Sequence, residues 1–329
     1  MDTDRKLKVA VVGTGEWWGY HHARLYHSRP DTELVGILGR SRDKTEARAA
    51  EFSVDGYTEL EALLEAEQPD LMSVCLPNEA HYETTLAIIR AGMPLLVEKP
   101  LVFDLEQADS LLAEAAERDL WFGLNFNHRY AVPVQRAKAA IEAGDLGPLN
   151  FATWRFGGEI GTSEHPQANL IETQCHGLDM LEHLCGPIES VSAEMTDPQG
   201  RGLTTMVVAL RFASGAVGSL VGSYDSSYAY PNTHMAEVNG RDGRLLIEDT
   251  VRRYTFNKAG DETAQVWQAG YFNDREREFH KIFDRHADAY LAAFRAGEEP
   301  PVHARAGRRA LAQAHAIIES FETGQRIAT

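Results

Sequence analysis

The tripeptide Glu98-Lys99-Pro100 is the first place where the sequence offers chemistry. It directly follows an apolar run at 94–97, which predicts a short buried strand. Ligands of parallel sheets bind at the carboxyl ends of the strands, so we expect Lys99 to contact a ligand. A lysine there can stabilise a developing alkoxide as an ammonium ion. It can instead be the base, since burial and a neighbouring positive charge both favour a neutral amine.

A second group of ionisable residues falls in a segment, 170–185, that predicts a helix: Glu172, His176, Asp179 and His183. At about 100° per residue these four share one helical face. His176 is the candidate base, because imidazole titrates near neutral pH, and Glu172 or Asp179 could orient it. The four could also hold a divalent ion, but adjacent turns of one helix rarely supply a whole site, so no metal is predicted. The plainer alternatives are a hydrogen-bonded core histidine and a purely structural Asp179.

A glycine-rich turn, Gly13-Thr14-Gly15-Glu16-Trp17-Trp18-Gly19, separates a strand predicted at 7–12 from a helix predicted at 19–28. In such a turn the backbone and the helix N-terminus bind the pyrophosphate of a dinucleotide. The usual spacing is G-x-G-x-x-G, and here the third glycine comes one residue late. Either Trp18 takes its place or the turn contains an additional residue. We predict cofactor contacts from Gly13, Gly15, Trp17, Trp18 and Gly19.

The end of the second predicted strand, 33–38, bears on the choice of cofactor. Chains that bind NAD usually carry an acidic residue there, which binds the ribose 2′-hydroxyl. Glu33 lies at the wrong end of the strand, and the exit instead reads Gly39-Arg40-Ser41-Arg42. Glycine leaves room for a 2′-phosphate, and Arg40, Ser41 and Arg42 can donate to it. We therefore expect NADP to be preferred over NAD; two solvated arginines in a turn are the alternative.

Strands and helices alternate through the first 125 residues. Beyond the turn, strands are predicted at 33–38, 70–76, 94–97 and 120–124. Helices are predicted from a capping box at Thr58 and Glu61 to Glu67, from Asn78 to Gly92, and from Asp104, with Gln107 at the reciprocal position. This alternation predicts a parallel sheet with helices on both faces, that is, an α/β Rossmann domain over residues 1–125.

The pattern changes after residue 125. Strands separated by Gly-containing turns are predicted at 149–156, 188–195, 203–213, 216–223, 233–239 and 243–248. Helices are predicted at 133–143, 170–185, 276–296 and 304–323. We therefore expect residues 126–329 to form an α+β domain with a large, mostly antiparallel open sheet, which binds substrate and mediates oligomerisation. Such a sheet needs a cover on its far face, so we expect a homodimer or homotetramer.

The composition narrows the class of protein. The chain has 329 residues, of which 43% are apolar, enough for a sizeable core and two domains. A net charge of −17 argues against nucleic acid and anionic membranes as partners. No apolar run could span a bilayer and the first residues lack a secretion signal, so a cytoplasmic protein is expected. The three cysteines, Cys75, Cys175 and Cys185, match no zinc or redox spacing and are expected as reduced core thiols.

These motifs together resemble the Gfo/Idh/MocA oxidoreductases, a family that includes many sugar and inositol dehydrogenases. The most specific elements are Glu98-Lys99-Pro100 and the downstream H-x-x-D helix of His176 and Asp179. The resemblance covers nearly the whole chain and also includes His22, Leu76-Pro77-Asn78-Glu79-Ala80-His81, Gly92, Asn127-His128-Arg129-Tyr130 and Ser320-Phe321-Glu322-Thr323-Gly324.

The resemblance implies roles for particular residues. Lys99 and His176 would flank the substrate beside the nicotinamide, and the peptide bond before Pro100 would be cis. Beyond the turn, cofactor contacts would come from Leu76, Pro77, Asn78, His81, Glu98 and Lys99. Substrate contacts would come from Lys99, Glu172, His176 and Asp179. The segment with Asn127, His128 and Arg129 could line the substrate pocket, and Arg155, early in the strand predicted at 149–156, could reach a phosphate or carboxylate group of the substrate. For these residues a purely structural role is the alternative. The chain departs from the family at Glu172, where aspartate is usual, and at Gln174, where glycine is usual, so the task of Glu172 is less defined.

The predicted function is hydride transfer between a nicotinamide cofactor and a hydroxyl or carbonyl group of a sugar, sugar derivative or inositol. One alternative is a redox-neutral use of the nicotinamide, in which transient oxidation of a sugar carbon promotes elimination or glycoside cleavage. Another is a non-catalytic sugar- or nucleotide-binding protein, since fold does not fix function. The presence of both Lys99 and His176 favours an enzyme over a binding protein.

Overall fold

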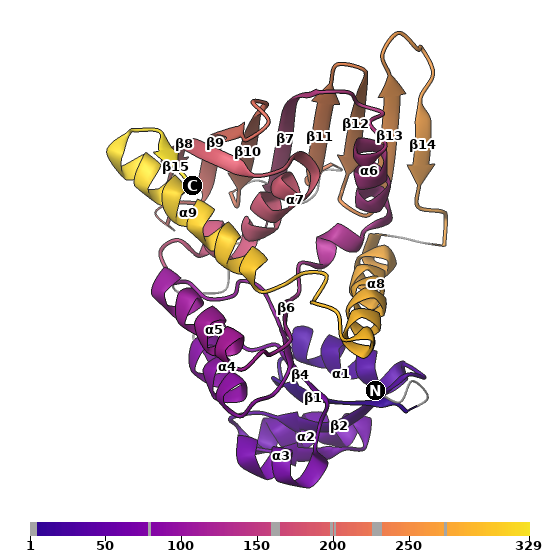
Figure 1. Cartoon of the computed structure of the whole chain (residues 1–329), viewed down its shortest axis with the longest axis vertical. Coiled ribbons are helices and arrows are strands. Elements are labelled where there is room, and N and C mark those ends of the chain that lie inside the picture. Colours follow the sequence, from indigo (N-terminus) through magenta and orange to yellow (C-terminus); the bar gives the residue numbers. More distant parts are fainter. Residues whose placement is uncertain are drawn as a thin grey trace. The chain divides into compact units, whose positions relative to one another are not determined.

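The computed structural model describes residues 5–77, 80–158, 165–197, 200, 202–225, 232–272 and 275–329 (Figure 1). The chain forms two compact units. Unit 1 consists of Met1–Asn125 and Ala287–Arg308, and unit 2 consists of Phe126–His286 and Arg309–Thr329. Residues 287–308, which the sequence analysis assigns to the second domain, therefore pack in the first.

Unit 1 is a six-stranded sheet in the order β3-β2-β1-β4-β5-β6, in which every neighbouring pair is parallel. Its strands are β1 (Leu7–Val12), β2 (Thr32–Leu38), β3 (Asp55–Tyr57), β4 (Leu71–Val74), β5 (Leu95–Val97) and β6 (Phe122–Leu124). Its connecting helices are α1 (Trp18–Ser28), α2 (Arg42–Phe52), α3 (Leu60–Glu67), α4 (His81–Arg90) and α5 (Leu105–Glu117). The predicted Rossmann arrangement is confirmed. The strand order reverses between β1 and β4, and ligands of such sheets bind at that reversal.

The helix starts of unit 1 follow the local sequence only in part. Asp104 caps α5 as predicted, because its carboxylate accepts a hydrogen bond from the Gln107 backbone N–H at 3.0 Å. The predicted capping box at Thr58 and Glu61 is wrong. Helix α3 has Glu59 at its N-cap position and begins one residue later than the box requires, with no side-chain cap.

Unit 2 is built on a nine-stranded sheet in the order β14-β13-β12-β11-β7-β10-β9-β8-β15. All neighbouring pairs are antiparallel except β7 and β10, so the prediction of a mostly antiparallel sheet is confirmed. The predicted strands are β7 (Leu149–Gly157), β8 (Ile188–Thr196), β9 (Thr205–Phe212), β10 (Val217–Ser223), β11 (Met235–Gly240) and β12 (Gly243–Glu248). The sequence analysis missed β13 (Arg253–Lys258), β14 (Gln265–Gln268) and β15 (Ile327–Ala328).

One face of the nine-stranded sheet is covered from within unit 2. Helices α6 (Val132–Glu142) and α7 (Cys175–Cys185) and most of α9 (Arg305–Thr323) lie over that face (Figure 1). The opposite face carries exposed apolar side chains, which the strand register places on the same side: Phe151, Val207, Val217 and Val266, each 40–51% exposed. The described part of unit 2 thus leaves an apolar sheet face open, as the alternation in its strands predicts.

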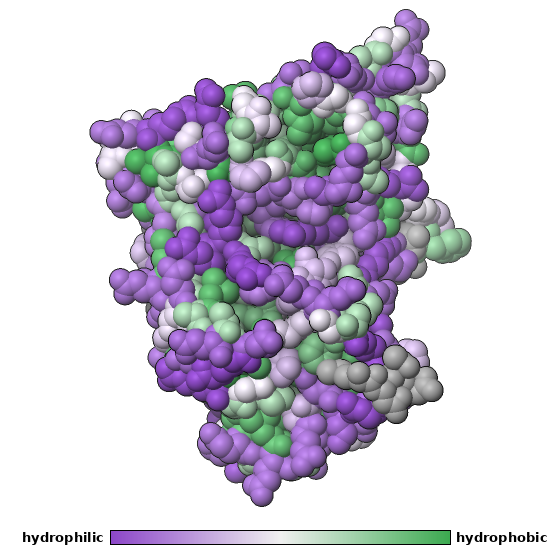
Figure 2. All heavy atoms as spheres, in the orientation of Figure 1, coloured by the Kyte–Doolittle hydropathy of each residue, from purple (hydrophilic) through white to green (hydrophobic). Residues whose placement is uncertain are grey.

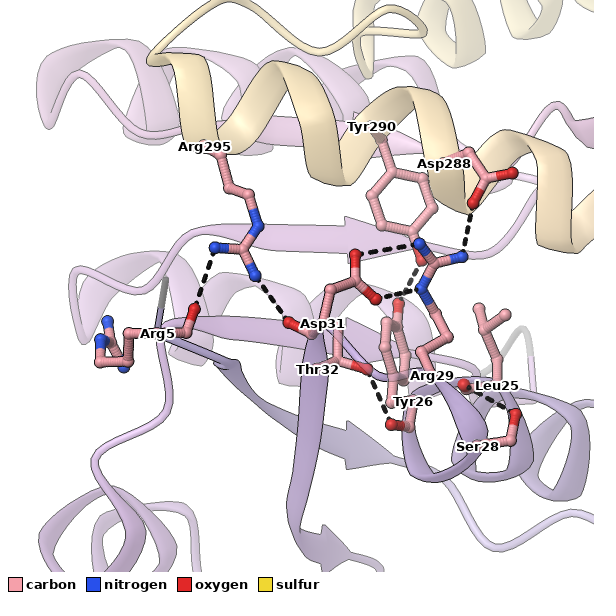
Figure 3. A network of polar contacts seen from close by, with 10 residues as sticks. All are labelled: Arg5, Leu25, Tyr26, Ser28, Arg29, Asp31, Thr32, Asp288, Tyr290 and Arg295. Carbon is pink, nitrogen blue, oxygen red and sulfur yellow. Dashed lines mark hydrogen bonds and ion pairs between the residues drawn. The ribbon is translucent and has the colours of Figure 1, made fainter. Parts of the chain in front are cut away.

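Polar contacts hold the returning segment of unit 1 in place. Helix α8 (Arg275–Ala296) crosses the division between the units, and its last turns belong to unit 1. Arg29 donates to Asp288 of this helix at 2.7 Å, and Arg295 donates to the carbonyl oxygens of Arg5 and Asp31 at 3.0 and 2.6 Å (Figure 3). These contacts join residues more than 250 positions apart, so no local pattern could reveal them.

The visible face of the molecule mixes hydrophilic and hydrophobic residues (Figure 2). On the face seen in Figure 2, hydrophobic residues form small groups between hydrophilic ones. None of the helices in the described part of the chain is both long and apolar enough to cross a membrane.

Candidate active site and cofactor site

The glycine turn after β1 is built for close packing. Gly13 has a φ of +134°, and a Cβ on it would lie 2.3 Å from the Cys75 carbonyl oxygen. A Cβ on Gly19 would lie 2.9 Å from the Gly13 carbonyl oxygen, so α1 can approach the turn only through a glycine at 19. The turn therefore contains one additional residue, and Trp18 does not replace the third glycine. A Cβ on Gly15 would meet only the Gly19 nitrogen, at 3.9 Å, which leaves this backbone open to close approach by a ligand.

The two tryptophans of the turn differ in environment. Trp17 is half exposed and meets His21 edge-on, with ring centroids 4.8 Å apart. Trp18 is less exposed, begins α1, and lies perpendicular to the ring of His22 at 6.2 Å. Trp17 is therefore the more accessible of the two, whereas Trp18 packs against a core histidine.

Gly39, at the exit of β2, is required by the packing of unit 1. A Cβ on this residue would lie 2.5 Å from Thr45 Oγ1 and 2.6 Å from the methyl carbon of Thr14. A larger residue would therefore displace either α2 or the glycine turn. The absence of a carboxylate at this position has a steric cause that is independent of any phosphate group.

The polar residues that follow Gly39 lie at the surface. Arg40, Ser41 and Arg42 are all exposed, and Ser41 occupies the N-cap position of α2. Arg42 forms an exposed ion pair with Glu46 at 3.5 Å. Such a pair is weak in water, so Arg42 can leave it for a phosphate.

A third arginine lies closer to the turn, and the sequence analysis missed it. The Arg48 guanidinium is largely buried, donates to Glu51, and lies 3.4 Å from the Gly15 carbonyl oxygen. It also packs over the Tyr20 ring at 5.4 Å. Arg48 brings a positive charge to the turn from helix α2, where no motif marks it.

The predicted contacts after β4 are described only in part. Leu76 is half buried and Pro77 is exposed, while Asn78 lies outside the described residues. Helix α4 has Ala80 at its N-cap position, and the predicted cap at Asn78 lies outside the described residues. His81, the first residue of α4, is buried, and burial lowers its pKa.

Glu98 and Lys99 leave β5 in a tightly held loop. The Lys99–Pro100 peptide bond is cis, as the resemblance implies. Glu98 is buried; its Oε1 accepts hydrogen bonds from His22 Nε2 and Asn125 Nδ2, and its Oε2 accepts the Lys99 backbone N–H. Burial would raise the pKa of Glu98, but the bond from His22, the charge of Lys99 and the bond from Asn125 together lower it. Glu98 is thus an anion that accepts hydrogen bonds at both of its oxygens, and Lys99 is half buried at the carboxyl end of β5.

The histidine helix of unit 2 is irregular where the sequence predicts one continuous helix. A π-helical turn, Asn169–Thr173, precedes α7. His176, Asp179 and His183 share a face of α7, and Glu172 lies in the π-helical turn that precedes it. Among the described residues, no three His, Cys, Asp or Glu side chains are arranged to hold a metal ion.

The ring of His176 is held between aromatic neighbours. His128 stacks on it with ring centroids 3.9 Å apart and planes within 7°. Phe126 meets it edge-on at 5.9 Å. Asn127, between these two, is buried in the same short 3-10 turn. The segment 127–129, which the sequence analysis gives as a candidate lining of the substrate pocket, therefore contacts the candidate base through His128.

Arg129 and Asp179 form a buried bidentate ion pair. Arg129 Nε donates to Asp179 Oδ2 at 2.8 Å, and a terminal nitrogen of Arg129 donates to Oδ1. Burial raises the pKa of Asp179 although Arg129 opposes the shift. Both carboxylate oxygens are thus engaged by Arg129, which matches the plainer structural alternative for Asp179.

Arg155 lies away from the other predicted substrate residues of unit 2. Its neighbours Trp154 and Phe156 are buried, and a Cβ on Gly177 of α7 would lie 2.3 Å from Trp154 Nε1. Because side chains alternate along β7, Arg155 is on the opposite, open face of the sheet. There it donates to the Asn232 carbonyl oxygen at 2.6 Å, so the structure does not bring Arg155 together with His176.

Gln174 joins the π-helical turn to the sheet. Its Nε2 donates to the Phe156 carbonyl oxygen at 3.2 Å and to the Tyr224 hydroxyl at 2.9 Å. Its Oε1 accepts from Trp154 Nε1 at 3.2 Å, and its side chain is fully buried. The residue that departs from the family's glycine is thus the main polar link beneath the His176 helix.

Comparison with known proteins assigns both halves of the chain. A family model described as an oxidoreductase family with an NAD-binding Rossmann fold matches residues 7–126. The companion model, described as the C-terminal alpha/beta domain of the same oxidoreductase family, matches residues 138–329.

Individual relatives agree with that assignment. A D-glucoside 3-dehydrogenase of Escherichia coli K12 is 30% identical over a match that covers 58% of each chain. A myo-inositol 2-dehydrogenase of Thermotoga maritima is 26% identical over 96% of each chain. Among solved structures, a levoglucosan dehydrogenase in complex with NADH and levoglucosan has the same fold, with a TM-score of 0.87, 18% identity, and coverage of 98% of this chain and 99% of that one.

The Rossmann unit, its glycine turn and these matches define a nicotinamide-dependent oxidoreductase. The chain belongs to the Gfo/Idh/MocA oxidoreductase family.

Proposed function

We propose that the protein transfers a hydride between a nicotinamide cofactor and a hydroxyl or carbonyl carbon of a sugar, sugar derivative or inositol. The observation that carries this proposal is the position of Lys99 at the carboxyl end of β5, where its backbone N–H donates to the anionic Glu98. The open backbone at Gly15 fits a pyrophosphate in the same unit. The relatives that act on glucosides and inositols support the substrate class.

The bound nicotinamide would supply the hydride acceptor, and the protein would manage the substrate proton. His176 is the proposed base, with a ring plane fixed by stacking on His128. Glu172 remains a candidate to orient His176 or to bind a substrate hydroxyl. Lys99 either stabilises the developing alkoxide as an ammonium ion or accepts the proton itself. Asn127 and Arg129 stay proposed substrate contacts, Arg129 through the nitrogen atoms that Asp179 leaves free.

A substrate screen with a Lys99→Ala control tests this proposal. Sugars and inositols are offered with NADP and NAD in parallel, and nicotinamide absorbance is followed. We expect Lys99→Ala to lower kcat by about 10²- to 10⁴-fold and to leave cofactor affinity intact. If Lys99 and His176 act in one step, the double alanine variant should be little worse than either single one. Intact turnover in Lys99→Ala would reject the assignment, and product formation without an absorbance change would favour the redox-neutral alternative.

We also propose that NADP is preferred over NAD. Arg40, Ser41 and Arg42 are exposed at the exit of β2 and can donate to a 2′-phosphate, while Gly39 presents no carboxylate to repel it. One charge-assisted hydrogen bond contributes roughly 1.5–3 kcal/mol, equivalent to at least tenfold in affinity. Arg40→Ala should therefore lower the affinity for NADPH by about tenfold or more and leave that for NADH unchanged. An unchanged ratio of the two dissociation constants would reject this preference.

The open sheet face of unit 2 is proposed to bind a second copy of the chain. Its exposed Phe151, Val207 and Val217 lie on neighbouring strands, and a two-fold axis would let the same patch cover itself. Val207→Glu would place charges in such an interface and should convert a dimer or tetramer into a monomer in analytical ultracentrifugation. A wild-type monomer at micromolar concentration would contradict the proposal.

A cytoplasmic location is proposed as well. The three cysteines Cys75, Cys175 and Cys185 are buried thiols, as expected of a protein from a reducing compartment. Cell fractionation with antibodies against the protein would test this location.

A further inference from the structure

A chain of hydrogen bonds crosses the core of unit 1, from Glu98 to the last turns of helix α8. Glu98 Oε1 and His22 Nε2 are 3.0 Å apart, and His22 Nδ1 lies 2.8 Å from Ser73 Oγ. The Tyr26 hydroxyl lies 3.0 Å from Ser73 Oγ and 2.6 Å from the Tyr290 hydroxyl. Four consecutive contacts thus link helix α1, strand β4, the β5 exit and helix α8.

Every member of this chain is buried. His22, Ser73, Tyr26 and Tyr290 have no exposed surface, and Glu98 is 4% exposed. No bulk water can replace a partner at such a depth, so a broken link leaves a polar group unsatisfied, at a cost of about 1–3 kcal/mol. The members are therefore constrained to keep their partners.

All hydrogen bonds of this hydrogen-bond chain are donated in one direction, toward Glu98. Glu98 is ionised and can only accept, so His22 Nε2 donates to it. Tyr26 donates its single proton to Ser73, which means that Tyr290 must donate to Tyr26. The remaining contact of Ser73 Oγ is with His22 Nδ1, which accepts the serine proton when the ring is neutral. With that arrangement each of the three hydroxyls donates one hydrogen bond, and the chain runs from Tyr290 to Glu98.

The two tyrosines are suited to remain donors. Burial raises the pKa of Tyr26 to about 12 and raises that of Tyr290 well above its usual value. Both hydroxyls therefore keep their protons throughout the pH range in which an enzyme works.

We propose that His22, Ser73, Tyr26 and Tyr290 are positioning residues for Lys99, acting through Glu98. Glu98 Oε2 accepts the Lys99 backbone N–H at 3.2 Å, so the orientation of its carboxylate fixes the start of the lysine loop. His22 donates to Glu98 and sets that orientation directly. Ser73, Tyr26 and Tyr290 act through His22, because their hydrogen bonds fix its tautomer and the plane of its ring. The catalytic consequence rests on the proposed role of Lys99, whereas the hydrogen-bond chain itself does not.

The outer end of the chain is anchored at the surface. Tyr290 lies on α8 beside the residues that fasten this helix to unit 1 (Figure 3). Arg29 bridges Asp288 of α8 and Asp31 before β2, at 2.7 and 2.8 Å. The chain therefore connects the lysine loop to a helix that follows it by almost 200 residues in the sequence.

Proton NMR of the full chain tests the hydrogen bonds without any substrate. An imidazole N–H donated to a buried carboxylate gives a slowly exchanging resonance downfield of the backbone amides. We expect His22→Gln to remove this resonance and Ser73→Ala and Tyr26→Phe to shift it, with a smaller shift in Tyr290→Phe. Thr32→Val is the matched control: it deletes a buried hydrogen bond to the Tyr26 carbonyl oxygen, outside the chain, and should leave the resonance in place.

The positioning of Lys99 is measured on the same variants. Trace acetylation followed by mass spectrometry gives the reactivity of the Lys99 amine, again without turnover. A displaced Glu98 would hold the Lys99 backbone less firmly and leave the amine more accessible. Lys99 should therefore be acetylated about two- to tenfold faster in Tyr26→Phe than in the wild type, a factor that corresponds to the free energy of one hydrogen bond. Thr32→Val should match the wild type. Once a substrate that the enzyme turns over is known, the same variants should also have a lower kcat than the wild type. The loss should be largest for the His22 variant and smaller in turn for the variants of Ser73, Tyr26 and Tyr290, with the cofactor affinity unchanged.

The outcomes separate this inference from the proposed function. The absence of the downfield resonance in the wild type, or equal Lys99 reactivity in Tyr26→Phe and Thr32→Val, would overturn the inference even if the enzyme reduces sugars. A wild type without dehydrogenase activity would overturn the proposed function. The resonance and the acetylation rates would still test the hydrogen-bond chain and its effect on Lys99.

Discussion

Each unit of the molecule buries one carboxylate beside a candidate catalytic residue, and the two behave in opposite ways. Burial pushes the pKa of both carboxyls upward. At Glu98 the hydrogen bond from His22, the Lys99 charge and the bond from Asn125 reverse that shift, whereas at Asp179 the ion pair with Arg129 does not.

The two carboxylates differ in the groups that donate hydrogen bonds to their oxygens. Glu98 distributes its oxygens over three donors from different elements, one of which is the backbone of Lys99 itself. Asp179 gives both oxygens to a single guanidinium. A carboxylate with several converging donors can orient a loop, while a carboxylate in a closed pair mainly neutralises its partner. We therefore expect Glu98 to matter chiefly for turnover and Asp179 chiefly for stability.

The largest expected effect is the loss of stability in Asp179→Ala. This change leaves the Arg129 charge buried without a partner, which typically costs about 3–5 kcal/mol. Urea denaturation followed by circular dichroism measures it. The double variant Arg129→Met with Asp179→Leu should recover most of the loss, because no charge stays buried. A double variant as unstable as Asp179→Ala would show that the pair does more than neutralise itself.

Glu98→Gln should affect turnover more than stability. Glutamine keeps the shape and can still accept from His22 and Asn125, but it loses the negative charge beside Lys99. A misplaced catalytic group costs on the order of 10²-fold in rate, so kcat should fall by about that factor while cofactor affinity is maintained. Initial rates and a fluorescence titration with NADPH measure both. If Glu98→Gln keeps the kcat of the wild type, Glu98 does not matter for turnover and the proposed difference between the two carboxylates is wrong.

Gln174→Gly, which restores the family's usual residue, should cost less. It breaks three hydrogen bonds in a fully buried place and leaves Trp154 and the Phe156 carbonyl oxygen without this partner. The expected loss is about 1–3 kcal/mol in the free energy of unfolding. Gln174→Glu, which keeps the acceptor for Trp154 but not the donor, separates the contributions. Unchanged stability in the glycine variant would mean that water takes over the role of the amide.

The smallest effect is the contribution of His183 to acid sensitivity. Burial, followed by the charges of Arg129 and Lys138, lowers its pKa to about 3 from a usual value of 6.5. Between those values the unfolded chain binds a proton that the folded chain does not, so stability falls as the pH falls below 6.5. His183→Gln should flatten that decline between pH 7 and pH 5 in urea titrations. An identical decline in the variant would assign it to other groups.

The sequence patterns that succeeded are local ones. The strand–turn–helix with Gly13 and Gly19, the alternation of strands and helices, and the Asp104 cap each depend on residues within a few positions of one another. The resemblance to the family placed Lys99 and the cis bond before Pro100. The alternation in β7 could also have placed Arg155 on the open face, because its neighbours Trp154 and Phe156 read as buried.

What failed or was missed depends on distant contacts. The capping box at Thr58 is a local exception: it was wrong because α3 begins at Leu60, which puts Glu59 at the N-cap position. The π-helical turn before α7 was missed as well, and Gln174 at its end is tied to the sheet through partners 18 to 50 residues away.

Local sequence patterns were sufficient to predict the Rossmann unit and its glycine turn, and they marked Lys99 and His176 as candidates. Short-range sterics, periodicity and hydrogen bonding control those features. The partner of each buried polar group became known only from the folded chain: Arg129 for Asp179, His128 for His176, and the hydrogen-bond chain from Tyr290 for Glu98. Burial makes such pairings obligatory, but it is the packing of distant segments that selects the partner.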